Sequence, residues 1–331
     1  MRRFTLFVVA GVGVVVGAGF MRPSPARAQA NKNTSLRLSV VGIGVKDYPK
    51  SENFYEKIMA FPVAFKFSSP DGKRTTTYYQ MSRDTFLEMQ PVTADALPGL
   101  THVHMVTDDL TATIARLRQA GLPAAARTAT TPNTVTEPGV AQPSNVKNAN
   151  IFEPNGIRLE LNELMPESLT KKATDAWGAA QESKKTSLML SVVGIAVKDY
   201  PESQNFYEKT MGFRVAFTFP SADGKRTTTY YQMSRDTFLE MQPVAADARP
   251  GLTHLHLLTD DLNGHIARLR QAGLPAASGN APAPSTVGVV ASVSPGSHVK
   301  NVNVFDPDGI RLELNEYVPE SLTKKASDSW K

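Results

Sequence analysis

The stretch SVVGIGVKDYPKSENFYEK, residues 39–57, decides the architecture because it returns as SVVGIAVKDYPESQNFYEK at residues 191–209. The two stretches lie 152 positions apart, and the match continues without a gap. Residues 39–125 and 191–277 differ at only 17 of 87 positions. A period of about 150 residues is the size of a whole domain and is far longer than a solenoid repeat. The 331-residue chain therefore contains one domain twice.

The repeat divides the chain into five parts. Between the well-matched parts of each copy, residues 126–145 and 278–296 match poorly and are rich in Ala, Pro, Thr and Gly, which predicts long loops. We predict a signal peptide over residues 1–30, a first domain over 36–164, a linker over 165–187, a second domain over 188–317 and a C-terminal tail over 318–331.

The first thirty residues have the composition of an export signal. Arg2 and Arg3 precede an uncharged apolar run over residues 4–20, and two A-x-A sites follow before residue 31. This order is typical of a secretory signal peptide that is cleaved, so we expect a periplasmic or secreted product without stable membrane insertion. The alternative is an uncleaved anchor, although the apolar run lies at the lower limit for a spanning helix.

Charge and cysteine content exclude several classes of protein. The leader carries four of the 36 basic residues and none of the 31 acidic ones, so the rest of the chain has a net charge of only +1. A near-neutral chain lacks the basic surface that nucleic-acid binding needs. The chain has no cysteine, which excludes disulfides, thiol catalysis and zinc sites that use sulfur.

Hydrophobic periodicity predicts the order β-α-β-β-β twice in each copy. In the first half of the first copy we predict strands over residues 36–45, 63–67, 75–81 and 85–90, a helix over 51–59 that Ser51 caps, and a turn at 70–72. In the second half we predict strands over 102–107, 148–152 and 157–162, a weak strand near Thr134, a helix over 110–119 that Gly121 stops, and a turn at 154–156.

Four segments of each copy resemble the vicinal oxygen chelate superfamily, which includes glyoxalase I, extradiol dioxygenases and the fosfomycin and bleomycin resistance proteins. In the first copy these segments are VKDYPKSENFYEKIMAF, TFLEMQ, THVHMVTDDL and EPNGIRLELNE. The resemblance covers about residues 36–164 and 188–317. It implies an α+β fold in which the two βαβββ units of each domain form a cupped mixed sheet, duplicated in tandem.

The resemblance also implies a metal that is held from four strands, the first and last of each unit. Matching by position places Glu88, His102 and Glu160 at three of these places. The second copy offers Glu240, His254 and Glu313. The fourth place falls on Val40 and Val192, whose side chains cannot bind metal.

Strand parity supports these assignments independently. Side chains two apart on a strand share a face, so Glu88 lies with Phe86 and Gln90, and His102 lies with His104. By the same rule, one residue of each pair Tyr78/Tyr79 and Tyr230/Tyr231 should face the cup. Carboxylates with imidazoles suit a divalent ion such as Fe, Mn, Ni or Zn. We expect His104 and His256 either to support the ligands or to serve as alternative ligands.

Two functions that involve a small molecule remain open, beside a third possibility, a non-catalytic structural pair that binds neither metal nor ligand. The first is a divalent-metal enzyme of lyase, isomerase or dioxygenase type, in which catalytic carboxylates move a proton; the candidates are Glu88, Glu160, Glu240 and Glu313. The alternative is a metal-free binding or sequestration protein of the bleomycin-resistance type, in which His102 bonds Glu88 and Glu160 pairs with Arg158. In either case the two domains could pair with each other.

Overall fold

A computed structural model describes residues 36–69, 71–178, 188–221, 224–244, 248–277 and 283–330. Both copies of the repeat belong to one compact unit. The predicted signal peptide and part of the predicted linker lie outside the described residues. So do residues 278–282 of the predicted long loop 278–296 and Pro70 in the predicted turn. Within the described ranges, no helix is long and apolar enough to cross a membrane.

The first copy runs from β1 to α3. Its strands are β1 (Arg37–Val45), β2 (Val63–Ser68), β3 (Thr75–Gln80), β4 (Phe86–Pro91), β5 (Gly99–Val106), β6 (Ala124–Ala125), β7 (Thr134–Thr136), β8 (Gly139–Ala141), β9 (Val146–Phe152) and β10 (Arg158–Glu163). Its helices are α1 (Tyr48–Asn53) with its π-helical continuation η1 (Phe54–Ile58), α2 (Leu110–Gln119) and α3 (Leu169–Ala176).

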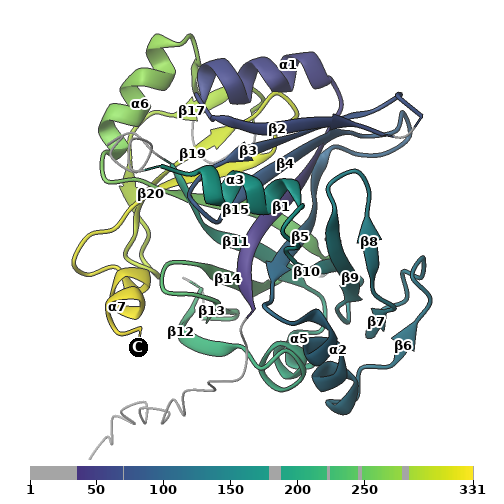
Figure 1. Cartoon of the computed structure of the whole chain (residues 1–331). Coiled ribbons are helices and arrows are strands. Elements are labelled where there is room, and N and C mark those ends of the chain that lie inside the picture. The colour runs from purple at the N-terminus through teal and green to yellow at the C-terminus, as the bar shows by residue number, and fades with distance from the viewer. Residues whose placement is uncertain are drawn as a thin grey trace, which may run out of the picture. The chain divides into compact units, whose positions relative to one another are not determined.

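The second copy repeats this order (Figure 1). Its strands are β11 (Met189–Val197), β12 (Arg214–Pro220), β13 (Thr227–Gln232), β14 (Phe238–Pro243), β15 (Gly251–Leu258), β16 (Ala276–Ala277), β17 (Thr286–Gly288), β18 (Ser292–Val293), β19 (Lys300–Phe305) and β20 (Arg311–Glu316). Its helices are α5 (Tyr200–Asn205) with η2 (Phe206–Thr210), α6 (Leu262–Gln271) and α7 (Leu322–Asp328).

Each copy forms one mixed ten-stranded sheet. In the first copy the strand order is β2-β3-β4-β1-β5-β10-β9-β7-β6, and β8 pairs with β9. The two βαβββ units join where β1 pairs antiparallel with β5. The second copy has the same order, beginning at β12 and ending at β16. The predicted fold class, a duplicated α+β domain with a mixed sheet, is confirmed.

The two faces of the sheet differ in chemistry, as strand alternation requires. On β4, Leu87 and Met89 belong to the large apolar core, together with Leu110, Ile114 and Leu117 of helix α2. Phe86 and Glu88 lie on the opposite face, which we call the inner face. The inner face therefore collects the polar side chains of the central strands.

Three local features differ from the predictions. Helix α1 begins after Asp47, whose carboxylate accepts a hydrogen bond from the Lys50 N–H, so Asp47 and not Ser51 is the cap. The predicted weak strand near Thr134 is present as β7, but the predicted loop 126–145 also contains the short strand β8, which was not predicted and pairs with β9. Helix α3 lies in the segment predicted as linker, and α7 in the segment predicted as tail.

The two copies contact each other through equivalent residues. Arg116 on α2 donates to the main-chain oxygens of Thr210 and Met211. Arg268 on α6 makes the same pair of contacts with the oxygens of Ile58 and Met59. Reciprocal contacts of this kind are the pattern of a two-fold symmetrical pair.

A buried carboxylate also lies between the copies. Asp306 is 0% exposed and accepts hydrogen bonds from the Tyr55 hydroxyl of the first copy, at 2.9 Å, and from the N–H groups of Asp308 and Ile310. Burial outweighs these hydrogen bonds and raises the pKa of Asp306 to about 6. In the first copy Glu153 takes the equivalent place, and burial raises its pKa too.

The raised pKa of Asp306 predicts a pH-dependent stability. The contribution of this group is fully present below about pH 4 and is lost as the pH rises through about 6. A shift of roughly 2 units corresponds to about 3 kcal/mol. As the pH rises from 4 to 7, the wild type should lose this stabilisation, whereas Asp306→Asn, which does not titrate at this position, should not. The unfolding free energy of Asp306→Asn should therefore gain up to about 3 kcal/mol relative to that of the wild type, measured by urea titration. Asp108→Asn, at an exposed site, should show no such gain; identical pH curves for all three proteins would refute the prediction.

Candidate metal centre

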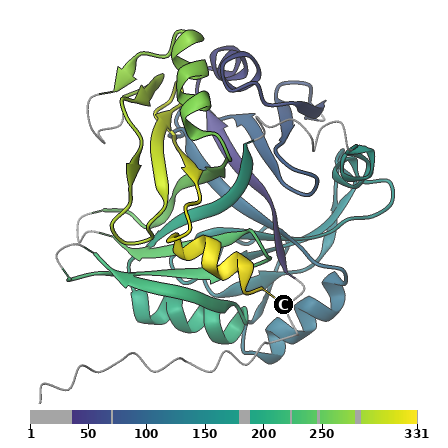
Figure 2. The same cartoon turned by 90° about the vertical axis from the view of Figure 1, so that its left-hand side faces the viewer.

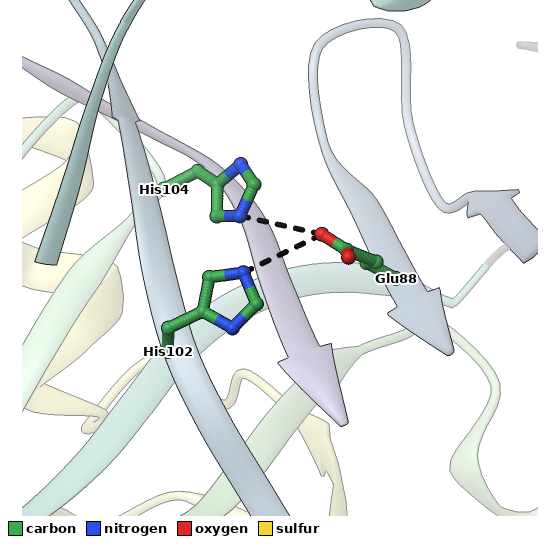
Figure 3. A group of neighbouring side chains, drawn as sticks. All are labelled: Glu88, His102 and His104. Atoms are coloured by element: carbon green, nitrogen blue, oxygen red, sulfur yellow. Dashed lines mark ion pairs between the residues drawn. The ribbon is translucent and has the colours of Figure 1, made fainter. Parts of the chain in front are cut away.

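A glutamate and two histidines converge on the inner face of the first copy. Glu88 comes from β4, and His102 and His104 come from β5, two positions apart and therefore on one face. Strand β1 lies between β4 and β5, and the three side chains meet across it (Figure 3). The Nε2 atoms of His102 and His104 lie 3.5 and 3.3 Å from the same oxygen, Oε2 of Glu88.

The second copy repeats the arrangement. The Nε2 atoms of His254 and His256 lie 3.4 and 3.2 Å from Oε2 of Glu240. All six side chains are buried, with exposed fractions between 2% and 8%. In each copy the three side chains offer ligand atoms that lie within 4.8 Å of one another. We call these groups the first triad (Glu88, His102, His104) and the second triad (Glu240, His254, His256).

The other ring nitrogen of each histidine in the first triad has a partner. Nδ1 of His102 lies 2.7 Å from the Thr101 hydroxyl. Nδ1 of His104 lies 2.9 Å from the Asn162 amide, whose oxygen accepts its proton when turned toward the ring. Metal-binding histidines typically donate their second N–H in this way. Both Nε2 atoms are thereby directed toward Glu88.

A tyrosine and an aromatic stack complete the wall beside Glu88. The Tyr78 hydroxyl donates to Oε2 of Glu88 at 2.8 Å, and Tyr230 does the same for Glu240 at 2.7 Å. The Tyr78 ring stacks on Phe65 with centroids 4.5 Å apart. Tyr79, by contrast, lies in the apolar core on the other face. Strand alternation predicted that one tyrosine of each pair faces the cup, and in the first copy this residue is Tyr78.

Glu160 lies beside the first triad rather than in it. Its Oε1 atom is 3.9 Å from Nδ1 of His104 and accepts a hydrogen bond from Asn148 at 2.7 Å, and its Oε2 atom pairs with Arg158 at 2.9 Å. Glu313 likewise lies 3.9 Å from Nδ1 of His256. The structure thus brings Glu88 and His102 together with His104, and the role of Glu160 and Glu313 as ligands stays a prediction.

The register of β1 against β5 explains why His104 takes this place. Val40, where the resemblance implies a ligand that the chain lacks, pairs directly with His104 across the two strands. Neighbouring side chains in such a pair have Cβ atoms about 5 Å apart. His104 can therefore present an imidazole near the place that Val40 leaves without a ligand.

The charges of the first triad are strongly coupled. Burial disfavours ionisation of Glu88, but its close pairing with the imidazoles of His102 and His104 outweighs burial, and the pKa of Glu88 lies well below the usual range. Burial and the nearby charge of His104 lower the pKa of His102. Burial acts on His104 too, but the carboxylates of Glu160 and Glu88 prevail and raise its pKa. The second triad shows the same directions.

These residues fit a divalent transition metal. The Nε2 atom of His104 is buried and has no hydrogen-bond partner among the described residues, and the same is true of His256. A buried polar atom without a partner is costly unless a ligand satisfies it. Two imidazoles and one carboxylate are a donor set that Fe, Mn, Ni and Zn accept.

A glycine on the first strand of each copy, Gly42 on β1 and Gly194 on β11, makes room for one histidine of each triad. A Cβ atom added at Gly42 would collide with the His102 ring, and one at Gly194 would collide with the His254 ring. The strand pairing shifts by one residue here, between Gly42 and Ile43, which leaves Thr101 as an extra residue on β5. Such β-bulges re-aim side chains next to functional sites. The sequence shows only a small residue at position 42, so its role was not predictable.

Substituting Gly42 by alanine should displace His102. We expect Gly42→Ala to lower the unfolding free energy by about 1–3 kcal/mol, as overpacking does, and to reduce metal uptake by the first copy. Denaturant unfolding and metal analysis measure the two effects. Gly44→Ala is the matched control, because the second copy already carries Ala196 at that position. Equal losses in both variants would show that the His102 ring is not the cause.

Comparisons with known proteins agree with this fold. No curated protein matches the chain in sequence. Among solved structures, the 2,3-dioxygenase LapB from Pseudomonas sp. KL28 has a TM-score of 0.63 at 14% identity, covering 85% of this chain and 92% of its own. The Mn(II)-bound glyoxalase from Novosphingobium aromaticivorans has a TM-score of 0.60 at 17% identity, covering 85% and 81%.

A variant of 4-hydroxymandelate synthase from Streptomyces coelicolor is similar in the same way, with a TM-score of 0.61, 14% identity, and coverage of 89% of this chain and 99% of its own. At these identities the likeness establishes the fold. The profile of one family matches the chain twice, at residues 37–161 and 189–314, which together make up most of its length. The chain therefore belongs to the Glyoxalase/Bleomycin resistance protein/Dioxygenase superfamily.

Proposed function

We propose that this protein is a divalent-metal-dependent enzyme that acts on a small oxygen-bearing substrate, with one metal site in each copy. The first triad and the second triad would hold the two ions. The observation that carries the proposal is the convergence of both Nε2 atoms on one Glu88 oxygen, with the Nε2 atom of His104 buried and, among the described residues, in contact with that carboxylate but without a hydrogen bond. The same geometry recurs at Glu240.

The donor set favours oxygenase chemistry over the lyase or isomerase alternative. Two histidines and one carboxylate with open positions are typical of non-haem Fe(II) oxygenases. Several structurally similar proteins are named as dioxygenases, including a halotolerant catechol dioxygenase and homoprotocatechuate 2,3-dioxygenase from Arthrobacter globiformis. A bound metal would polarise substrate oxygens and leave coordination positions open for them.

The chain's own residues would supply orientation and proton transfer. The Tyr78 hydroxyl donates to Glu88 and holds this carboxylate in one rotamer. Glu160 lies outside the triad, and although burial opposes its ionisation, His104, His102 and Arg158 outweigh burial and lower its pKa. A carboxylate next to the triad can accept a substrate proton, so Glu160 and Glu313 are the candidate bases. On the inner face, Val40, Tyr78 and Phe86 form a buried apolar cluster.

Metal analysis of the purified protein tests the proposal. After anaerobic exposure to Fe(II), or to Co(II) as a stable substitute, and removal of excess metal, we expect about two equivalents per chain. Oxygen consumption with catechol as the probe substrate then tests oxygenase chemistry. Less than a tenth of an equivalent of metal in protein that still binds small aromatic molecules would overturn the proposal in favour of the metal-free binding alternative.

We further propose that residues 1–30 direct export and are removed, which would place the enzyme in the periplasm or outside the cell. Two arginines, an apolar run and A-x-A sites support this reading. Determining the N-terminal residue of protein from the culture fluid or periplasm tests it. A new N-terminus near Asn31 is expected, and an intact Met1 in exported protein would contradict cleavage.

A further inference from the structure

A cavity of about 420 Å³ lies at the boundary between the two copies. Its polar wall includes Gln242, Thr253 and Arg311 of the second copy, and its apolar wall includes Leu252 and Ile310. Residues 98–100 of the first copy, at the start of β5, also line it. The cavity is open on one side, and residues of both copies line it.

Two residues of the polar wall lie next to the second triad. Gln242 follows Glu240 by two positions on β14, so both face inward. Thr253 immediately precedes His254, and its hydroxyl lies 2.7 Å from Nδ1 of that ring. Gln242 therefore shares a strand face with Glu240, and Thr253 is adjacent to and hydrogen-bonded with His254.

The third polar residue, Arg311, is fixed beside the same triad by strand pairing. Arg311 on β20 pairs with His254 on β15. It shares the inner face with Glu313, two positions further along the strand. The triad side chains are not among the residues that line the cavity, but three lining residues lie next to them on β14, β15 and β20.

The opposite end of this inner face is covered. Along β11, Val192 pairs with Phe238, Gly194 with Glu240, and Ala196 with Gln242. Val192 and Phe238 pack against Ala326 of helix α7, whose main-chain oxygen also accepts a hydrogen bond from Gln232. Figure 2 shows α7 lying against strands of the second copy. A ligand would therefore approach the triad from the Gln242 end, where the cavity lies.

Arg311 differs from its equivalent in the first copy. Arg158 is paired with Glu160 at 2.9 Å. The guanidinium of Arg311 has neither an ion pair nor a hydrogen bond within the described ranges, and it faces the cavity. The cavity also contains Asp308, but the carboxylate of Asp308 accepts hydrogen bonds from the Lys46 N–H and the Ser51 hydroxyl of the first copy. Both bonds go to Oδ2 and come from uncharged donors, so they do not neutralise the carboxylate. Arg311 is the positively charged side chain in the cavity lining that an anionic ligand could pair with.

We propose that this cavity is the substrate pocket of the second triad, and that it takes a small carboxylate with an apolar, ring-sized body. A guanidinium with free donors binds a carboxylate through two parallel hydrogen bonds. Leu100, Leu252 and Ile310 would pack against the apolar body, while Gln242 offers an amide near the triad. The proposal rests on the metal-dependent function above, and it adds that the first copy helps to build the pocket of the second.

Benzoate is a suitable probe because it joins a carboxylate to one ring, and benzamide is its neutral counterpart of the same shape. In calorimetric titration of the purified chain, we expect one benzoate per chain, at least tenfold tighter than benzamide. Arg311→Gln should weaken benzoate at least tenfold and leave benzamide unchanged. The matched control is Arg158→Gln, which should leave benzoate binding within twofold of the wild type.

A second variant tests the wall that the first copy supplies. Leu100→Trp should fill the cavity and weaken both probes, while metal content stays at the wild-type value. Equal benzoate affinity in the wild type and Arg311→Gln, or no preference over benzamide, would overturn the proposal. Metal content measured on the same samples separates the two claims. If benzoate binds through Arg311 in protein without metal, the proposed enzymatic function is refuted and the proposed pocket is not. If metal binds and benzoate does not, the proposed pocket is refuted and the proposed metal sites are not.

Discussion

Replacing Glu88 and Glu240 together by alanine is expected to abolish metal binding. In each triad the glutamate supplies the anionic oxygen, and both imidazole nitrogens lie 3.2–3.5 Å from it. Two neutral imidazoles on one strand without a carboxylate bind a divalent ion far more weakly. Metal content should fall from two equivalents per chain to less than about 0.2, and each single variant should retain one equivalent, measured by elemental analysis after equilibration with Co(II).

A structural loss must be separated from the loss of a ligand. Removing Glu88 leaves the Tyr78 hydroxyl without its acceptor, which costs about 1–3 kcal/mol for a buried group. Glu88→Gln keeps a hydrogen-bond acceptor of the same shape while it removes the charge. We expect Glu88→Gln to remain folded by circular dichroism and still to lose one metal equivalent. Two equivalents in the double alanine variant would show that the triads are not the metal sites.

The features of this protein that were predictable from its sequence are those that depend on residues close together in the chain or on the repeat itself. The repeat identified the duplication because nearly identical stretches must fold alike. Period-two alternation placed Glu88 on the inner face, opposite the core residues Leu87 and Met89, because side chains of a strand alternate whatever its partners are. The same rule assigned one tyrosine of each pair to that face. Helix α2 begins and ends as predicted, with Gly121 after its end at a φ of 96°.

Features that depend on pairing between distant strands were not predictable in this way. The proximity of His104 to Glu88 follows from the register of β5 against β1, which places His104 beside Val40. The shift at Thr101 changes that register by one residue, and nothing in the local sequence marks it. The packing of α3 against Val40 and Phe86 likewise depends on tertiary contacts, so its segment had the composition of a linker. The uncertain part of the site was therefore the choice between His104 and Glu160.

Substituting those two residues separately should decide that choice. We make both changes in a Glu240→Ala background, so that only the first triad contributes metal. His104→Leu is expected to reduce metal content from one equivalent to less than about 0.2, because it removes one of two imidazole ligands. Glu160→Gln is expected to keep one equivalent, because its carboxylate is engaged with Arg158 and Asn148 and lies 3.9 Å from His104.

Turnover separates the roles further. If Glu160 accepts a substrate proton, Glu160→Gln should lower kcat about 100-fold or more with metal content unchanged, within the range typical of general-base removal. A Co(II) absorption spectrum that is altered in His104→Leu but preserved in Glu160→Gln would support the same assignment. The reverse result, with metal lost only in Glu160→Gln, would establish the ligand set of Glu88, His102 and Glu160 that the family resemblance implies, and His104 would then serve to hold Glu160 and Glu88 in place.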